Sequence, residues 1–117
     1  MVKERLGKVT IAPGVLLTIV RLTALSIPGV TRMSGHLTDG VDRFLGKAHV
    51  GEGVRIKIED DMVTVDIHIL VRPDVNMLKL GRALQVEVAR AISDMVGMGV
   101  KQVNIHIDNV DVDLPNA

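Results

Sequence analysis

The chain has 117 residues, which is the usual size of one domain and too short for two ordinary ones. Its 14 basic and 14 acidic residues cancel, and its single aromatic residue is Phe44, so neither an overall positive field nor an aromatic platform favours nucleic-acid binding. It has no cysteine, so the single domain expected over 1–117 folds without a disulfide and suits a reducing compartment.

Residues 8–11 alternate polar and apolar side chains, which predicts a short strand. Pro13 then suits the first turn of a helix, where its missing N–H would be unpaired anyway. The stretch 11–25 is interrupted by polar residues and is shorter than the roughly 20 residues needed to cross a bilayer, so no membrane span is expected. The predicted helix ends at Pro28-Gly29, and its apolar positions have the spacing of a buried stripe: Leu16, Ile19, Val20, Thr23, Ala24 and Ile27.

Residues 30–53 form an irregular, glycine-rich segment with a predicted short helix at 39–45. A loop of this length inside a compact domain is uncommon unless it has a function. We therefore expect its part from Gly35 to Gly53 to be a working surface, with Phe44 and Lys47 as candidates for contact with a partner.

Residues 54–59 and 63–69 alternate strictly between apolar and polar side chains on either side of Asp60-Asp61. This pattern is typical of a β-hairpin in which one face of each strand is buried. It is the clearest structural signal in the sequence.

A second helix is predicted after Asn76, a plausible N-cap, and Gly97 or Gly99 closes it. Residues 103–108 alternate again and predict a last strand, followed by a short acidic tail over 108–117. The buried stripe of the helix is expected to comprise Met77, Leu80, Leu84, Val88, Ala91, Ile92 and Met95.

The expected order of elements is βαββαβ, and the fold class is α+β. Three strands with one apolar face and two amphipathic helices form most simply a two-layer sandwich. In this sandwich an antiparallel-rich sheet carries both helices on one face and is open to solvent on the other.

Several stretches, taken in chain order, resemble the bacterial alkaline shock protein family, also called the Gls-type envelope stress response family. They are GKVTIAPGVL at 7–16, IPGV at 27–30, FLGK at 44–47, GVRIKI at 53–58 and VKQVNIHI at 100–107. The resemblance covers residues 7 to 110. It implies a non-enzymatic cytoplasmic protein of cell-envelope homeostasis or stress, with no cofactor, which in some members associates with the membrane through a partner.

Two histidines stand at outward positions of predicted strands, each beside a carboxylate on the same strand face: Asp66-x-His68 and His106-x-Asp108. If the strands were close, Asp66, His68, His106 and Asp108 could form a metal site with nitrogen and oxygen ligands. In a ferredoxin-like strand order, however, the first strand would separate the two groups. The simpler interpretation is a set of solvated polar positions on an open sheet face.

No catalytic signature is present. The serines stand in no G-x-S-x-G motif, and neither a P-loop nor a G-x-G-x-x-G motif occurs. The sequence therefore predicts that the chain is not an enzyme.

The leading hypothesis is a protein-binding or scaffolding module of the envelope stress type. An exposed sheet edge would also permit self-association by strand addition. The alternative is a small metal- or ligand-sensing domain that uses the outward His and Asp residues. The candidate partner-binding residues are Arg55, Lys57, Asp66, His68, Asn104 and His106 on the open sheet face, together with Phe44 and Lys47.

Overall fold

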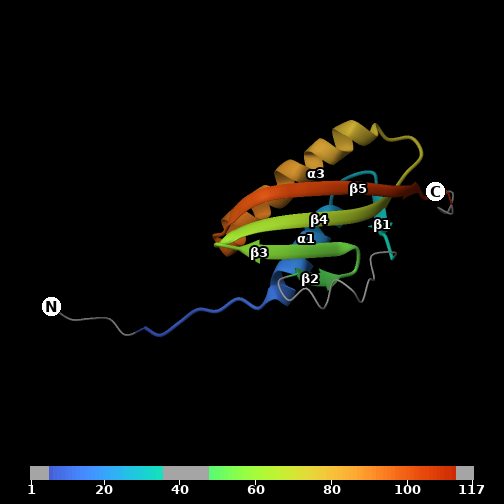
Figure 1. Cartoon of the computed structure of the whole chain (residues 1–117). Coiled ribbons are helices and arrows are strands. Elements are labelled where there is room, and N and C mark those ends of the chain that lie inside the picture. Colours follow the sequence, from blue (N-terminus) through green and yellow to red (C-terminus); the bar gives the residue numbers. More distant parts are fainter. Residues whose placement is uncertain (1–5, 36–47, 113–117) are drawn as a thin grey trace.

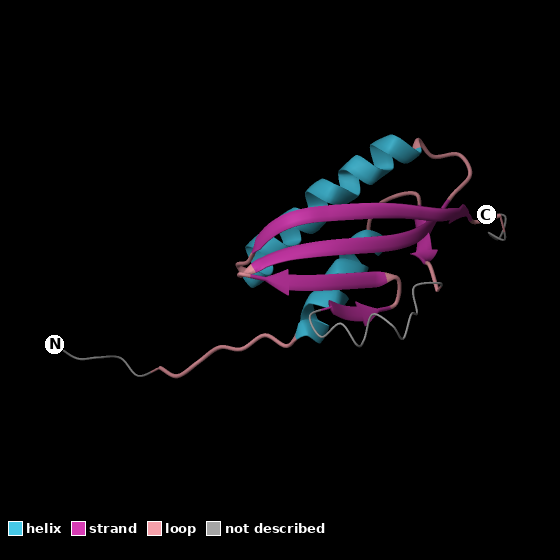
Figure 2. Ribbon diagram, in the orientation of Figure 1, coloured by secondary structure: helices cyan, strands magenta, loops and turns pink. Residues whose placement is uncertain are grey.

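The computed structural model describes residues 6–35 and 48–112, which form a two-layer α+β sandwich (Figure 1). Both helices lie on the same face of the sheet (Figure 2). The elements in chain order are α1 (Pro13–Leu25), β1 (Val30–Met33), β2 (Ala48–Gly51), β3 (Val54–Glu59), β4 (Met62–Val71), α3 (Met77–Ala91), a π-helical turn (Ile92–Val96) and β5 (Gly99–Val110).

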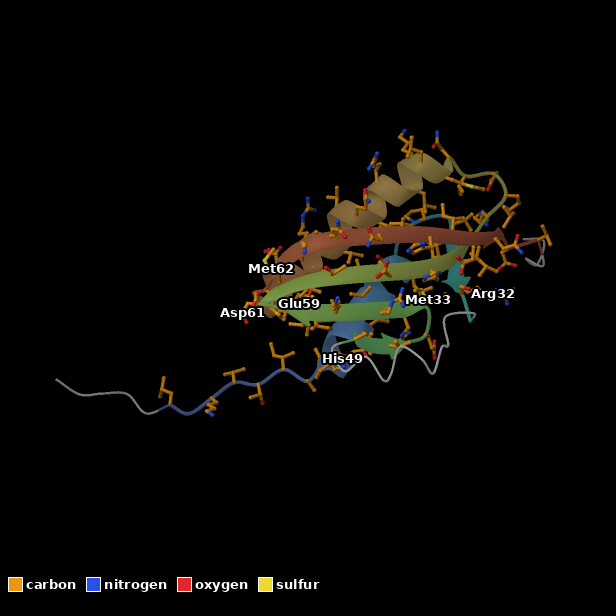
Figure 3. All side chains as sticks on the ribbon, in the orientation of Figure 1. Arg32, Met33, His49, Glu59, Asp61 and Met62 are labelled. Atoms are coloured by element: carbon orange, nitrogen blue, oxygen red, sulfur yellow. The ribbon has the colours of Figure 1, made fainter. Side chains whose placement is uncertain are left out.

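The sheet is built around β4. Along one side of β4 lie β3, which carries β2 on its outer edge, and β1, and all of these pairings are antiparallel. Along the other side lies β5, which runs parallel to β4. Figure 3 places Asp61 and Met62 at one end of the sheet and Arg32 and Met33 at the other. The predicted antiparallel-rich sheet with two helices on one face is confirmed.

The predicted order of elements was wrong at the N-terminal end. Residues 8–11 have the alternation of a strand but belong to none, since no neighbouring strand of the described chain pairs with them. Two short strands, β1 and β2, instead lie within the segment predicted to be irregular. The predicted helix at 39–45 lies outside the described residues.

Helix α1 forms as its sequence predicts. Pro13 occupies its first turn, and Leu16, Val20 and Ala24 face the sheet and are buried. Helix α3 begins at the predicted cap, where the Asn76 Oδ1 accepts a hydrogen bond of 3.0 Å from the backbone N–H of Lys79. In the described residues no helix is long and apolar enough to cross a membrane.

Two methionines expected in the core of α3 are exposed. Met77 stands in the first turn, and Met95 lies in the π-helical turn, where it is 67% exposed. A π-helical turn has more residues per turn than an α-helix, so the buried stripe moves on by one position after Ile92. Val96 packs against the core in place of Met95, and Gly97 ends the helix with a left-handed φ of 79°.

The hairpin of β3 and β4 is confirmed. Its turn residues, Asp60 and Asp61, have φ values of 52° and 63°, the positive values that a tight type I′ hairpin turn requires. Beyond the turn, alternate side chains of β4 enter the core between the sheet and the helices. They are Val63, Val65, Ile67, Ile69 and Val71, and all are fully buried.

Asp111 fastens the short strand β1 to the end of β5. Its carboxylate is buried, accepts a 2.9 Å hydrogen bond from the Thr31 hydroxyl and lies 3.2 Å from the Arg32 Nε. Its backbone N–H donates to the carbonyl of Val71 at 2.7 Å. Asp111 is therefore a structural anchor, although the sequence predicts it to lie in a short acidic tail.

We expect Asp111→Ala to lower the free energy of unfolding by about 1–3 kcal/mol, because it removes the buried carboxylate that accepts from the Thr31 hydroxyl and pairs with Arg32 on β1. Urea unfolding followed by far-ultraviolet circular dichroism measures this, since the chain has no Trp or Tyr for fluorescence. Asp74→Ala is the matched control, because Asp74 is exposed and pairs only locally with Arg72, and it should change stability by no more than about 0.5 kcal/mol. Equal losses in both variants would contradict the anchoring role.

Candidate functional site

The side of the sheet opposite the helices carries polar side chains, because alternate residues of each strand turn away from the core. We call this surface the polar face. It comprises Arg55 and Lys57 of β3, Thr64, Asp66 and His68 of β4, and Asn104, His106 and Asp108 of β5. The sequence had predicted that these residues share one face, and the strand registers agree.

The two histidines lie directly opposite each other on neighbouring strands. In the parallel pairing of β4 with β5, Asp66 stands beside Asn104 and His68 beside His106. The imidazole rings stack with their centroids 4.2 Å apart and their planes at 9°. The expectation that a strand would separate the two groups was wrong, because α3 returns the chain to the position next to β4.

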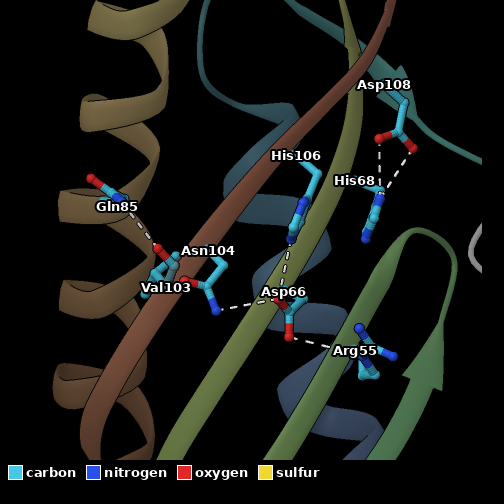
Figure 4. A network of polar contacts seen from close by, with 8 residues as sticks. All are labelled: Arg55, Asp66, His68, Gln85, Val103, Asn104, His106 and Asp108. Carbon is cyan, nitrogen blue, oxygen red and sulfur yellow. Dashed lines mark hydrogen bonds and ion pairs between the residues drawn. The ribbon is translucent and has the colours of Figure 1, made fainter. Parts of the chain in front are cut away.

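The carboxylates pair with histidines across the strands rather than along them (Figure 4). The Nδ1 of His68 lies 3.1 Å from both carboxylate oxygens of Asp108. The Nε2 of His106 lies 3.2 Å from the Oδ1 of Asp66, which also accepts a 3.2 Å hydrogen bond from the Asn104 amide. The Nε of Arg55 lies 3.8 Å from the other oxygen of Asp66. Together these six residues form one continuous network, which we call the histidine network.

Asp108 reaches His68 because β5 bulges at this point. Ile69 of β4 pairs with Ile107, and the next residue of β4, Leu70, pairs with Asn109, so Asp108 is an extra residue in its strand. Bulges of this kind redirect a side chain. Burial acts to raise the pKa of Asp108, but hydrogen bonds from the buried Ser34 hydroxyl and from His68, together with the positive charge of His68 and His106, outweigh it and hold the pKa below 3.8.

The lowered pKa of Asp108 predicts a pH dependence of stability. Because the pKa is lower in the folded chain than the ordinary value of 3.8, the unfolded chain binds more protons in that range, and the stabilisation present above pH 3.8 is lost as the pH falls below it. In urea titrations, Asp108→Asn should be less stable than the wild type at pH 6, and the gap should narrow as the pH falls through 3.8 towards the lower folded pKa. A gap of constant size across this range would contradict the prediction, and Asp74→Asn is the control.

Some predicted residues lie outside the histidine network. Lys57 pairs with Glu59 on its own strand at 3.7 Å. Phe44 and Lys47 lie outside the described residues. Conversely, sequence reasoning missed Ser34, whose buried hydroxyl bonds to Asp108, because an isolated serine after a short strand gives no pattern.

The arrangement offers hydrogen-bond donors and acceptors on an open surface. Across residues 6–35 and 48–112, no group of three His, Cys, Asp or Glu side chains is placed to hold a metal ion. A cavity of about 580 Å³ lies between β1 and the β2–β3 turn, and the histidines and aspartates of the network are not among its lining residues. The network therefore lies on a surface and outside this pocket.

Comparison with known proteins places the chain in a family. The model of the alkaline shock protein 23 family, which is described by a cell envelope-related function, matches residues 1–112. The chain belongs to this family. The resemblance seen in the sequence is confirmed, and the function of this alkaline shock protein 23 family member is cell envelope-related at the level of the family description.

Two relatives of this family member come from Bacillus subtilis. The uncharacterized protein YqhY is 32% identical over 108 residues, which cover 92% of this chain and 80% of YqhY. The uncharacterized protein YloU is 23% identical over 115 residues, which cover 97% of this chain and 96% of YloU. Neither name states a catalytic activity.

The fold is shared with solved structures of MamM CTD. The zinc forms of two MamM CTD variants each superpose with a TM-score of 0.51 and 13% sequence identity, covering 88% of this chain and 91% of theirs. At this identity the likeness concerns the fold of the alkaline shock protein 23 domain alone.

Proposed function

We propose that this chain is a non-catalytic, protein-binding module of cell-envelope homeostasis, acting from the cytoplasmic side, and that a protein partner docks on the polar face. The observation that carries the proposal is the histidine network, which is fully assembled on a sheet surface that neither helix covers. The family's cell envelope-related description supports the setting.

The network is suited to binding because its side chains are already ordered. His68, Asp66 and Asp108 are held at 19%, 20% and 25% side-chain exposure by each other and by Asn104. When a partner docks on such a surface, the side chains of the network lose little further conformational entropy, and this raises the affinity obtained from each contact. Positively and negatively charged side chains stand side by side in the network. Such a surface complements the mixed charges of a protein better than it complements a polyanion.

Comparative capture from the native cell tests this proposal. The tagged full chain should recover a partner from the membrane fraction, and Arg55→Ser and His106→Ser should each reduce that recovery at least about tenfold, a loss of about 1.4 kcal/mol. Arg90→Ser is the matched control, because Arg90 lies on the outer side of α3 and pairs with Glu87 there. Recovery of the chain alone, or equal recovery by all three variants, would count against the proposal.

A second candidate function is metal or ligand sensing on the same face. The observation in its favour is the face-to-face placement of His68 and His106, each beside a carboxylate. Imidazole nitrogen and carboxylate oxygen are ligands that suit zinc. Calorimetric titration of the full chain with Zn²⁺ separates the two candidates: sensing requires saturable heat that His106→Ser removes, and heat no greater than that of dilution eliminates it.

A further inference from the structure

The segment before α1 has the sequence of a strand but pairs with no strand in the part of the chain that the structure describes. Residues 6–12, which we call the arm, leave the domain without pairing and run away from it (Figure 1). Val9 is 92% exposed, and Leu6 is 87% exposed. Ala12, the last residue of the arm, has extended backbone angles of −67° and 146°. An extended segment with unpaired backbone groups is a template for pairing with another chain, and exposed apolar side chains that lie together mark interaction sites.

Strand β5 forms the edge of the sheet on the side away from β2. Within the described residues, β5 pairs with β4 only, along its full length from Gly99 to Val110. The side chain of Gln85 donates a 3.1 Å hydrogen bond to the carbonyl of Val103, which shows that this backbone group points to the free edge. Backbone groups two residues apart in a strand point the same way, so those of Ile105 and Ile107 are directed to the same edge.

Beside this edge lies an open groove whose lining is about half apolar and half polar. It has a volume of about 410 Å³ and runs between α3 and β5. Leu78, on its wall, is 71% exposed. Gly81 has no side chain to narrow the groove, and an atom added at its Cβ position would have no neighbour within 4 Å. Its lining residues are Met77, Leu78, Gly81, Arg82, Gln85, Ile105 and Ile107.

The arm does not reach the groove of its own chain. It leaves the domain at the start of α1 and runs away from it (Figure 1), and none of its described residues lines the groove. Helix α1 itself packs against α3 as well as against β1, β2 and β3. The arm of a second copy is equally exposed and can approach this groove from outside.

We propose that the arm of one copy adds as a strand to the β5 edge of a second copy. Val9 and Ile11 then enter the groove against Ile105, Ile107 and Leu78. Lys8 and Thr10 fall on the other side of the added strand, on the side of the polar face that carries Asp108. Reciprocal exchange of the two arms gives a closed dimer of two-fold symmetry. This inference is independent of the function proposed for the polar face.

Cysteine cross-linking tests this contact directly, because the chain has no cysteine of its own. Val9→Cys and Leu78→Cys full-length chains, carrying tags of different mass, are mixed under mildly oxidising conditions. We expect the mixed disulfide to form roughly tenfold faster than in a mixture of Val9→Cys with Val86→Cys, since docking raises the effective concentration of the two thiols. Val86 is the matched control because it is an exposed α3 residue that does not line the groove.

Two results would overturn the proposal. One is a mixed disulfide that forms no faster with Leu78→Cys than with Val86→Cys. The other is a link that closes within single chains when the Val9→Cys, Leu78→Cys double variant is oxidised at high dilution. Thr10→Pro, which removes a backbone N–H from the arm without touching the folded domain, should slow the mixed disulfide to the control rate. Arg55→Ser should leave the rate of the mixed disulfide unchanged. Failure of the arm proposal can therefore be told apart from failure of the proposal for the polar face.

Discussion

Replacing Gly53 by alanine should lower the free energy of unfolding by about 2–4 kcal/mol. Gly53 has a φ of 67°, which a side chain disfavours, and a Cβ there would lie 2.7 Å from the carbonyl oxygen of His68 and 2.9 Å from the Cβ of Met33. Neither neighbour can move easily, because the His68 backbone bonds to both Gly53 and Ser34 where β1 and β3 meet on β4.

The same substitution should disturb the polar face, since it displaces the backbone that carries the His68 ring. Urea unfolding by circular dichroism gives the stability, and the chemical shifts of the His68 ring protons report its position. Gly81→Ala is the matched control: nothing lies within 4 Å of the added atom, and alanine in a helix should stabilise the chain by about 0.5–1 kcal/mol. If both substitutions moved stability in the same direction, the crowding at Gly53 would not be the cause.

Ile67→Ala should lower the free energy of unfolding by about 2–5 kcal/mol, because it opens a cavity in the middle of the core. Ile67 is fully buried on β4, with Val54 of β3 on one side and Ile105 of β5 on the other. A loss of this size is a large part of the stability of a small domain. The loss is measured as a shift of the urea midpoint while the m-value, the dependence of the unfolding free energy on urea concentration, stays constant.

Ile67→Val keeps the measurement possible if the alanine variant does not fold. It removes one methylene and should cost about 0.5–1.5 kcal/mol, whereas Val86→Ala on the exposed side of α3 should change stability by about 0.5 kcal/mol or less. A loss in Ile67→Val no larger than that in Val86→Ala would show that the packing around β4 is loose.

Local pattern was sufficient for the central elements of the fold. Strict alternation over 54–59 and 63–69 predicted β3 and β4, and the cap at Asn76 with the stripe through Leu84 predicted α3. Local pattern failed for β1 and β2, which have four residues each and no fully buried position. These strands exist because β4 and β3 are beside them, and such long-range pairing leaves little trace in a short sequence.

The same limit applied to the polar face. A period of two residues correctly placed Asp66 with His68 and Asn104 with His106 on one face. It could not reveal that His68 pairs with Asp108 and His106 with Asp66, because those contacts depend on which strand lies next to which. The arm shows the opposite failure, since residues 8–11 have the pattern of a strand and pair with no strand among residues 6–35 and 48–112.

The pairing of β5 with β4 also determines the stage of folding at which the polar face forms. The β3–β4 hairpin closes through a two-residue turn, whereas His68 and Asp108 are 40 positions apart and meet only after α3 has packed. Contacts between distant parts of a chain form late in folding, because their loops are entropically costly to close. A nascent chain in which β5 has not yet packed therefore has the hairpin but neither the histidine network nor the β5 edge.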